Sequence, residues 1–421
     1  MVQLLTWNRM VMILLMVVLA CTNCGAYSVL THEELIDLAW NESIRPALLA
    51  KFPNATDHDL VVAHSFAYGG SAMQDMGYYP FGKRFFSNLT HYVRSGDFVA
   101  WMLKNASTVN EYAFAMGALS HYLGDSIGHS EAINPSTAIE FPKLEKKYGS
   151  KVTYGESPHG HIRTEFAFDV QEMKNTEFAP PAYLRHIGFR VPRKFLERAF
   201  AATYGFNLSE VLGEPIPALK SYRTSVRSFI PSFAEAEVVL HGHQFPPNPD
   251  NEAYQIFYGR VKQTNYDRHW KHTYKGPGFK AHLLAVLVFL VPKVGAASDL
   301  AIKIPNEQTQ ELYLKSVNQT VDAFRDTVQR ALSDANKTFV LANVDLDTGH
   351  GDVLGEYELA DQAYRQLLGR LTAKRERSIP GDLKKHMLDF FASAADPSEL
   401  SDQTSNQLSI LKDMKVGGMG E

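Results

Sequence analysis

The chain has 421 residues, of which 45% are hydrophobic and 21% charged, as in an ordinary globular protein. Its formal net charge of −4 gives no sign of the basic excess that a nucleic-acid surface normally shows, although a local basic groove could hide within that total. The length allows two or three domains.

The first 26 residues have the pattern of an export signal. Arg9 precedes the uncharged residues 10–20, and the small residues Gly25 and Ala26 follow. A basic start, a short apolar run and a small-residue cleavage site are typical of a secretory signal peptide, and the run is short for a membrane span. We therefore expect a secreted or periplasmic protein that is cleaved after Ala26, with an uncleaved anchor as the alternative.

Both cysteines of the chain, Cys21 and Cys24, lie inside this segment. Cleavage after Ala26 would remove them, so any zinc site of the mature protein must use His, Asp and Glu. A competing interpretation takes residues 18–21, which read Val-Leu-Ala-Cys, as a lipoprotein signal with Cys21 lipidated.

After residue 27 the pattern is mostly helical, with no convincing alternating strand. Breaks rich in proline and glycine occur at residues 179–181, 244–249 and 276–278. We expect an all-α protein: a multi-helix bundle over 27–245, an additional C-terminal helical region over 246–395, and a loose polar tail over 396–421.

Several helices can be placed within this outline. Thr108 and Glu111 have capping-box spacing at the start of one helix, and Pro158 opens another that runs to about residue 174. Further helices are predicted at about 308–334, 354–377 and 381–393. The apolar run 283–291 is followed at once by Pro292 and Lys293, which predicts a buried helix rather than a membrane span.

Residues 121–129 read HYLGDSIGH and place His121, Asp125 and His129 four residues apart. On a helix these side chains would rise along one face. The apolar residues 113–119 just before them are typical of a buried helix. Because buried charge needs a partner and His and Asp are zinc-ligand types, the pattern favours a metal site over an exposed polar stripe.

Other candidate ligands precede and follow this helix. His161 and Glu165 form a second pair at helical spacing, whereas the nearby His159 has no carboxylate at that interval. Candidates that stand alone in their own segments are His32, Asp75 and His91. Each alone is more typical of a capped surface residue, but the ordered set is informative.

In this order the residues resemble the zinc-dependent phospholipase C family and its relatives, the single-strand-specific zinc nucleases, over roughly residues 27–175. The resemblance implies a phospholipase C-like helical fold and a trinuclear zinc cluster. It implies that Tyr27, as the mature N-terminal residue, binds one zinc through its amino group and carbonyl, together with His32. The nucleases have tryptophan there, but this coordination does not depend on the side chain.

The resemblance assigns the remaining ligands in turn. Asp75 and His91 match an aspartate and a histidine of another zinc, and His121 with Asp125 matches an H-x-x-x-D motif whose aspartate bridges two metals. His129 matches the next histidine, after a gap slightly shorter than the family pattern.

His161 and Glu165 match the closing H-x-x-x-E motif. Phospholipases of the family carry glutamate at the second position and the nucleases usually aspartate, so Glu165 favours the phospholipase side. The implied metal ligands are therefore Tyr27, His32, Asp75, His91, His121, Asp125, His129, His161 and Glu165.

The implied activity is hydrolysis of a phosphodiester by a zinc-activated water, with Asp75 as general base. We expect a secreted phospholipase C-type enzyme that acts on a phospholipid headgroup, with peripheral contact to a membrane surface and no stable nucleic-acid complex. Two alternatives stay open: a zinc-dependent single-strand nuclease, and a non-catalytic helical protein that binds metal.

Three other features allow more than one interpretation. The aromatic residues 78–86 after Asp75 could enter a lipid headgroup region, stack bases or pack the core. Residues 345–352 resemble a calcium loop, but His350 stands where the loop needs glycine. His64 is predicted to be a core histidine or a support for a metal ligand.

Overall fold

The structure is a computed structural model that describes residues 29–290, 302–333, 339–374, 376–394 and 400–417. These residues are largely helical, and the only β-type pairing among them consists of two isolated bridges, Val344 with Gly351 and Ile379 with Val416. The all-α prediction is therefore confirmed. The predicted signal peptide, both cysteines and Tyr27 lie outside the described residues.

The helices of the N-terminal half are α2 (Val29–Ala39), η1 (Trp40–Ile44), α3 (Arg45–Lys51), α4 (Asp57–Ser71), η2 (Gln74–Tyr78), α5 (Arg84–Tyr92), α6 (Ser95–Asn105), α7 (Val109–Gly128), η3 (His129–Ile133), α8 (Asn134–Glu140), α9 (Pro142–Tyr148), α10 (Pro158–Asn175), α11 (Pro181–Ile187), α12 (Arg193–Tyr204), α13 (Leu208–Leu212) and α14 (Pro215–Thr224). Those that follow are η4 (Ser225–Phe229), α15 (Ile230–His241), η5 (Gly242–Gln244), α16 (Glu252–Val261), α17 (Asn265–His269), η6 (Lys271–Thr273), α18 (Phe279–Leu290), α19 (Glu307–Ser333), α20 (Glu358–Thr372), α21 (Gly381–Ala392) and α22 (Asp402–Asp413).

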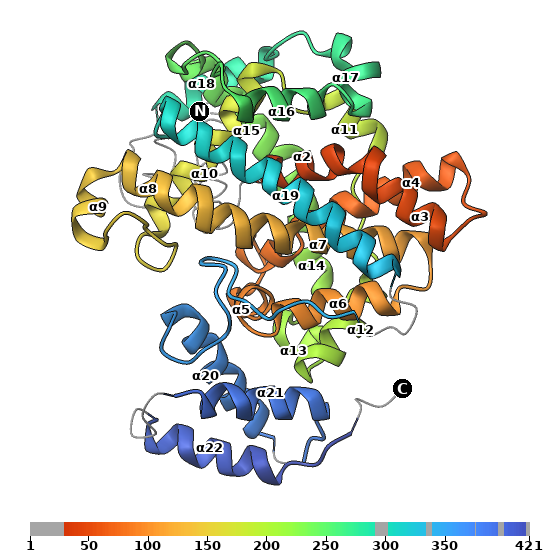
Figure 1. The fold of residues 1–421 in the computed structure, drawn as a ribbon, viewed down its shortest axis with the longest axis vertical. Helices are drawn as coiled ribbons and strands as arrows, with labels where there is room; N and C mark the ends of the chain where they lie inside the picture. The colour runs from red at the N-terminus through yellow and green to blue at the C-terminus, as the bar shows by residue number, and fades with distance from the viewer. Residues whose placement is uncertain (1–28, 291–301, 334–338, 375, 395–399, 418–421) are drawn as a thin grey trace, which may run out of the picture.

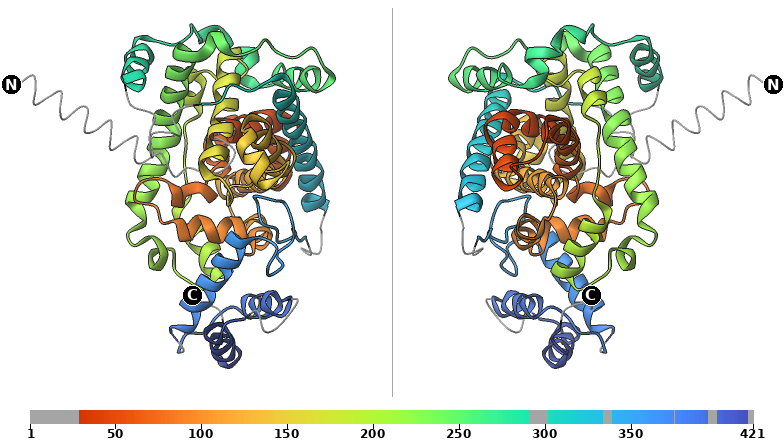
Figure 2. Two further views of the ribbon diagram at one scale, coloured as in Figure 1. Left: turned by 90° about the vertical axis from the view of Figure 1, so that its left-hand side faces the viewer. Right: turned by 90° about the vertical axis from the view of Figure 1, so that its right-hand side faces the viewer.

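Helix α7 runs through the middle of the main body and packs against α4, α6 and α19 (Figure 1). Every residue from Tyr112 to Asp125 is buried, as the apolar sequence before the HYLGDSIGH segment predicted. Helices α20, α21 and α22 form a lobe at one end of the molecule in all views (Figures 1 and 2). The buried apolar core nevertheless continues from Val29 to Met414.

The start of α7 differs in one detail from the predicted capping box. The Thr108 hydroxyl accepts a hydrogen bond from the Glu111 amide at 3.1 Å, as expected. The Glu111 carboxylate, however, accepts from the Ser107 amide at 2.9 Å rather than from Thr108. Helix α10 begins at Pro158 as predicted, and α19 and α21 lie within a residue or so of their predicted bounds.

Two expectations for the C-terminal half are corrected. Helix α18 was expected to be buried, but Leu283 is 49% and Phe289 is 74% exposed, because only one side of the helix packs against α15. The tail expected to be loose contains α22, whose Leu411, together with Met414 just after it, is buried. Within the described residues, no helix has the length and apolar character that crossing a membrane requires.

Arg94 joins the C-terminal lobe to the bundle. Its guanidinium donates to the Thr203 carbonyl at 2.8 Å and to the Asp382 carboxylate of α21 at 2.5 Å, and it also pairs with Asp97. Arg94 is buried and has a left-handed backbone, with φ of 51°, so these contacts hold a conformation that a non-glycine residue rarely adopts.

Helices α4 and α7 cross with their backbones nearly touching. A Cβ atom added to Gly117 would lie 2.1 Å from the Ala67 carbonyl oxygen, and one added to Gly70 would lie 2.1 Å from the Phe114 carbonyl oxygen. Glycine is therefore required at both positions for this approach. The crossing fixes the position of α7 one helical turn before His121.

We expect Gly117→Ala to lower the free energy of unfolding by about 2 kcal/mol, because a side chain forced into a packed crossing typically costs ~1–3 kcal/mol. Urea unfolding followed by circular dichroism measures this. Gly259→Ala is the matched control: Gly259 lies within α16, and a Cβ atom there would meet nothing within 4 Å. The control should be neutral or stabilising by up to about 1 kcal/mol. Equal destabilisation by both changes would contradict the close crossing.

Candidate metal centre

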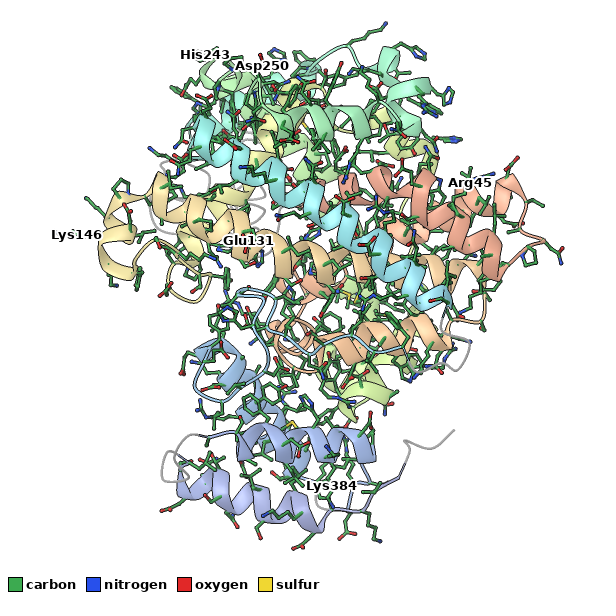
Figure 3. The ribbon with its side chains drawn as sticks, viewed as in Figure 1. Arg45, Glu131, Lys146, His243, Asp250 and Lys384 are labelled. Atoms are coloured by element: carbon green, nitrogen blue, oxygen red, sulfur yellow. The ribbon has the colours of Figure 1, made fainter. Side chains whose placement is uncertain are left out.

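The eight predicted ligands that the structure describes lie in the interior, and none is more than 3% exposed. They are His32 on α2, Asp75 on η2, His91 on α5, His121 and Asp125 on α7, His129 at the start of η3, and His161 and Glu165 on α10. By contrast, the charged residues Arg45, Lys146 and Lys384 lie at the periphery (Figure 3). Buried charge on this scale requires compensation within the site.

The ligand atoms form three groups, in each of which the atoms lie within 4.8 Å of one another. The groups are His32–His121–Asp125, Asp75–His91–His121 and His129–His161–Glu165. The sequence alone had placed His129 on the same face as His121 and Asp125. The structure instead brings it to the pair on α10.

Asp125 lies between the first two groups. Its Oδ1 is 3.2 Å from His32 Nε2, and its Oδ2 is 2.9 Å from His121 Nε2 and 3.4 Å from His91 Nε2. The two oxygens therefore face different histidines, as the oxygens of a carboxylate that bridges two metal ions would.

The helix type changes between α7 and His129. The α-helix ends at Gly128, and a π-helical turn begins at His129. Such turns alter the direction of the side chains and are frequent at functional sites. His129 Nε2 is 3.1 Å from Glu165 Oε1 but 3.9 Å from Asp125 Oδ1, so it belongs to the α10 group.

Backbone carbonyls orient three of the histidines. The Nδ1 atoms of His91, His121 and His129 lie 2.8–3.0 Å from the carbonyl oxygens of Ser87, Ser71 and Leu346, respectively. A carbonyl can only accept, so each Nδ1 must carry the hydrogen. In the neutral ring Nε2 then presents a lone pair to the centre, which is the arrangement typical of metal-binding histidines.

Some ligand atoms of the cluster are paired with one another and others are not. His91 Nε2 and His121 Nε2 are 3.4 Å apart, close enough for one ring to donate a hydrogen bond to the other when its Nε2 carries a proton. In the described part of the chain, both nitrogens of His161 and both carboxylate oxygens of Asp125 lack a partner in hydrogen-bonding geometry. These nitrogen and oxygen donors fit zinc, which binds both types.

Burial and the neighbouring charges shift the pKa values of residues in the cluster. Burial raises the pKa of Asp125, but His121 and His129 outweigh it and hold that pKa well below its usual value. Burial raises the pKa of Asp75. Burial lowers the pKa of His91, but Asp125 and Asp75 outweigh it and raise that pKa to about 10. In the absence of metal, the carboxylates thus draw positive charge into the cluster.

Local contacts hold the two segments that carry isolated ligands. Ser87 of α5 donates to the Gln74 carbonyl at 2.6 Å and accepts from the Gly77 amide at 2.9 Å, which fixes Asp75 relative to α5. Asp169 of α10 accepts from the amides of Leu30 and Thr31, each at 3.0 Å. It therefore caps the start of the helix that carries His32.

The loop that follows α19 reaches the cluster, which the sequence did not indicate. The Leu346 amide donates to the His91 carbonyl at 3.1 Å, and the Leu346 carbonyl accepts from His129 Nδ1. Asp347 Oδ1 lies 3.5 Å from the same nitrogen, and Asp347 Oδ2 accepts from the Tyr92 and Tyr357 hydroxyls at 2.8 and 2.5 Å. Asp347 thus supports His129 from the side opposite to its ligand atom.

The calcium-loop interpretation of this segment is not supported. Asp345 accepts hydrogen bonds from the amide and hydroxyl of Thr348, and Asp352 accepts from Tyr364. With Asp347 directed to the tyrosines, the acidic side chains of the segment point to separate partners. Among the described residues, they form no group that could hold an ion.

The remaining candidates lie outside the three ligand groups. His64 stacks on Trp40 with ring centroids 3.8 Å apart, and its Nε2 lies 3.2 Å from Asp37 Oδ1, so it is a core histidine outside the cluster. His159 belongs to none of the ligand groups found among the described residues. In the aromatic segment after Asp75, four rings are buried (Tyr78, Tyr79, Phe85 and Phe86), whereas Phe81 is 73% exposed.

An all-helical bundle with three buried groups of histidines and carboxylates defines a class of metal-dependent proteins. Comparison of the sequence with protein families identifies the class more closely: a family model described as zinc dependent phospholipase C matches residues 31–210. That range contains all eight ligand candidates that the structure describes, so the part of the chain that is similar to this family is also the part that carries the three groups. No curated protein and no solved structure matches the chain. Asp347 lies outside the matched range.

We expect Asp347→Asn to weaken zinc binding by about tenfold to a hundredfold, as loss of a group that supports a ligand typically does. Asparagine keeps the size of the side chain and can still accept from a tyrosine hydroxyl, but it loses the charge that faces His129. Competition with a zinc chelator measures the affinity, and circular dichroism checks the fold.

Asp345→Asn is the matched control in the same loop, because the Asp345 carboxylate bonds to Thr348 within the loop. It should leave the zinc affinity unchanged. An equal loss in both variants would mean that the loop, rather than the Asp347 carboxylate, supports the site.

Proposed function

We propose that this protein is a zinc-dependent phosphodiesterase that hydrolyses a phospholipid headgroup, as a phospholipase C does. The observation that carries the proposal is the set of three buried ligand groups, two of which share His121, within a part of the chain that matches the zinc-dependent phospholipase C family. Zinc ions held a few ångströms apart suit displacement at phosphorus.

The three groups suggest how the zinc ions would be held. One ion would be bound by Asp75, His91 and His121, a second by His129, His161 and Glu165, and a third by His32 with the amino group and carbonyl of Tyr27, while Asp125 would be shared. When bound, zinc polarises a phosphoryl oxygen and provides hydroxide at neutral pH.

Asp75 is the proposed general base. Its Oδ1 lacks a hydrogen-bonding partner in the described part of the chain and lies 3.2 Å from His91 Nε2, at the edge of the ligand groups. Burial raises the pKa of this carboxyl, which brings it closer to the range in which it can take a proton from an attacking water. Asp75 would therefore both hold metal and accept a proton at Oδ1.

Two tyrosines form an apolar wall beside the cluster. The Tyr78 ring lies 5.8 Å from the His91 ring, and the Tyr154 ring lies 5.7 Å from the His161 ring, with 6.4 Å between the two tyrosines. They connect the Asp75 group with the α10 group. In the proposed enzyme they would limit the access of water to the reacting phosphate.

A phospholipid is favoured over a nucleic acid on two grounds. Glu165 is the residue that the family's phospholipases carry where the nucleases usually have aspartate. The net charge of −4 also provides no general attraction for a polyanion.

We expect the zinc-loaded protein to release the phosphorylated headgroup from a soluble short-chain phosphatidylcholine and to leave single-stranded DNA intact. A chelator should abolish turnover, and added zinc should restore it. The assay measures both substrates on one preparation of known metal content. Hydrolysis of DNA alone would support the nuclease alternative, and bound zinc without turnover of either substrate would support the non-catalytic one.

We further propose that the protein is exported and cleaved after Ala26. Cleavage there would make Tyr27 the N-terminal residue, two residues before the described start of α2, whose first turn Asp169 caps. The new amino terminus would thus precede His32 by five residues in the chain.

Mass spectrometry of the exported protein should therefore show an unmodified N-terminus at Tyr27 and close to three zinc ions per chain, as in a trinuclear site of this type. The amine can bind metal only when it is free. A lipidated Cys21 would place that nitrogen in a peptide bond, and the proposed role of Tyr27 would be wrong.

A further inference from the structure

Helix α18 exposes a continuous apolar stripe. Phe279, Leu283, Val286 and Phe289 follow one another at intervals of three and four residues, so they lie along one side of the helix. Their exposed fractions are 83%, 49%, 55% and 74%. A run of large exposed apolar side chains on one element is unusual for a protein surface and marks an interaction site.

The opposite side of α18 packs against α15. Ala281, Ala285 and Val288 are buried, and Val288 packs with Phe233 of α15. The small residues on this side let the helix lie close to α15, and the larger ones are left outside. Other large exposed apolar side chains in the described residues are spread over different elements (Phe81, Ile216, Ile256, Leu332, Val340, Val353 and Val416).

The sequence around the stripe is basic. No Asp or Glu occurs between Asp267 and Asp299, although the whole chain has a net charge of −4. The Lys and Arg residues in this interval are Arg268, Lys271, Lys275, Lys280 and Lys293. Lys275 just before α18 and Lys280 in its first turn are both exposed.

We infer that α18 and the basic segment leading into it form a surface that docks onto a membrane containing anionic phospholipid. This inference rests on the proposed function, because a phospholipase C must reach a headgroup held in a bilayer. Beyond that function, the inference identifies the part of the chain that contacts the bilayer. The stripe would lie among the headgroups and upper acyl chains, with Lys275 and Lys280 near the lipid phosphates.

The charge around α18 and the length of the helix both favour a membrane surface as the partner of the stripe. A second copy of the chain that covered the stripe symmetrically would bring the lysines of the two copies together, which is electrostatically unfavourable. An anionic lipid surface instead pairs with them. At 12 residues, α18 is too short to cross a bilayer, so it would lie in the plane of the interface.

The test is sedimentation of the zinc-loaded protein with vesicles of phosphatidylcholine, with and without phosphatidylglycerol. We expect binding that phosphatidylglycerol strengthens. The triple change Leu283→Ser, Val286→Ser and Phe289→Ser should weaken binding by about tenfold or more, because the apolar area available to the interface is lost. The matched control Val340→Ser with Val416→Ser removes exposed apolar side chains elsewhere and should leave binding unchanged.

A second variant, Lys275→Glu with Lys280→Glu, keeps the packing of α18 intact. It should abolish the preference for vesicles that contain phosphatidylglycerol, since each basic residue near such a surface contributes about fivefold to binding. Unchanged binding in both variants would overturn the inference. So would a dimer in size-exclusion chromatography that the serine variant converts to monomer, because the stripe would then join two copies.

Turnover of the soluble short-chain phosphatidylcholine separates docking from catalysis. Both α18 variants should retain it while losing activity on vesicles. If the protein binds vesicles through α18 but hydrolyses neither form of the lipid, the docking surface stands and the proposed function fails. If the variants hydrolyse vesicles as fast as the parent protein, the function stands and the docking surface fails.

Discussion

The structure depends on the burial of five histidines and three carboxylates at one place, none more than 3% exposed. Such a group is stable only when each charge and lone pair has a partner. Pairing within the cluster is incomplete, since both nitrogens of His161 and both carboxylate oxygens of Asp125 lack a partner in hydrogen-bonding geometry among the described residues. The domain therefore has the form of a helical shell around a set of donor atoms directed inward, which metal ions would complete.

Much of the surrounding architecture serves to hold those donors. The close crossing of α4 and α7 at Gly70 and Gly117 fixes the central helix, and the π-helical turn at His129 directs one ligand to α10. Asp169 caps the helix that carries His32. Each of these features fixes the position or direction of a segment that carries candidate ligands.

The segment after α19 links the C-terminal lobe to this chemistry. Leu346 and Asp347 contact two histidines that are candidate ligands, and Arg94, two residues after Tyr92, pairs with Asp382 of α21. The C-terminal part is thus in physical contact with the site, although the family match ends at residue 210. In our proposal helix α18 packs its buried side against α15, and its exposed side meets a lipid surface that the buried site could not reach alone.

The sequence by itself determined the all-α class, several of the helices and the candidate ligands, because these depend on short-range spacing. His121 with Asp125 and His161 with Glu165 are pairs that a single helix sets, and the apolar residues before His121 already indicated a buried helix. Tertiary structure alone decided that His129 joins the α10 group, that Asp347 supports it, and that one side of α18 is uncovered. These outcomes depend on a local change of helix type and on packing partners far away in the chain, such as Leu346, 217 residues from His129. Helical spacing specifies which side chains share a face, but only the packed fold specifies what that face meets.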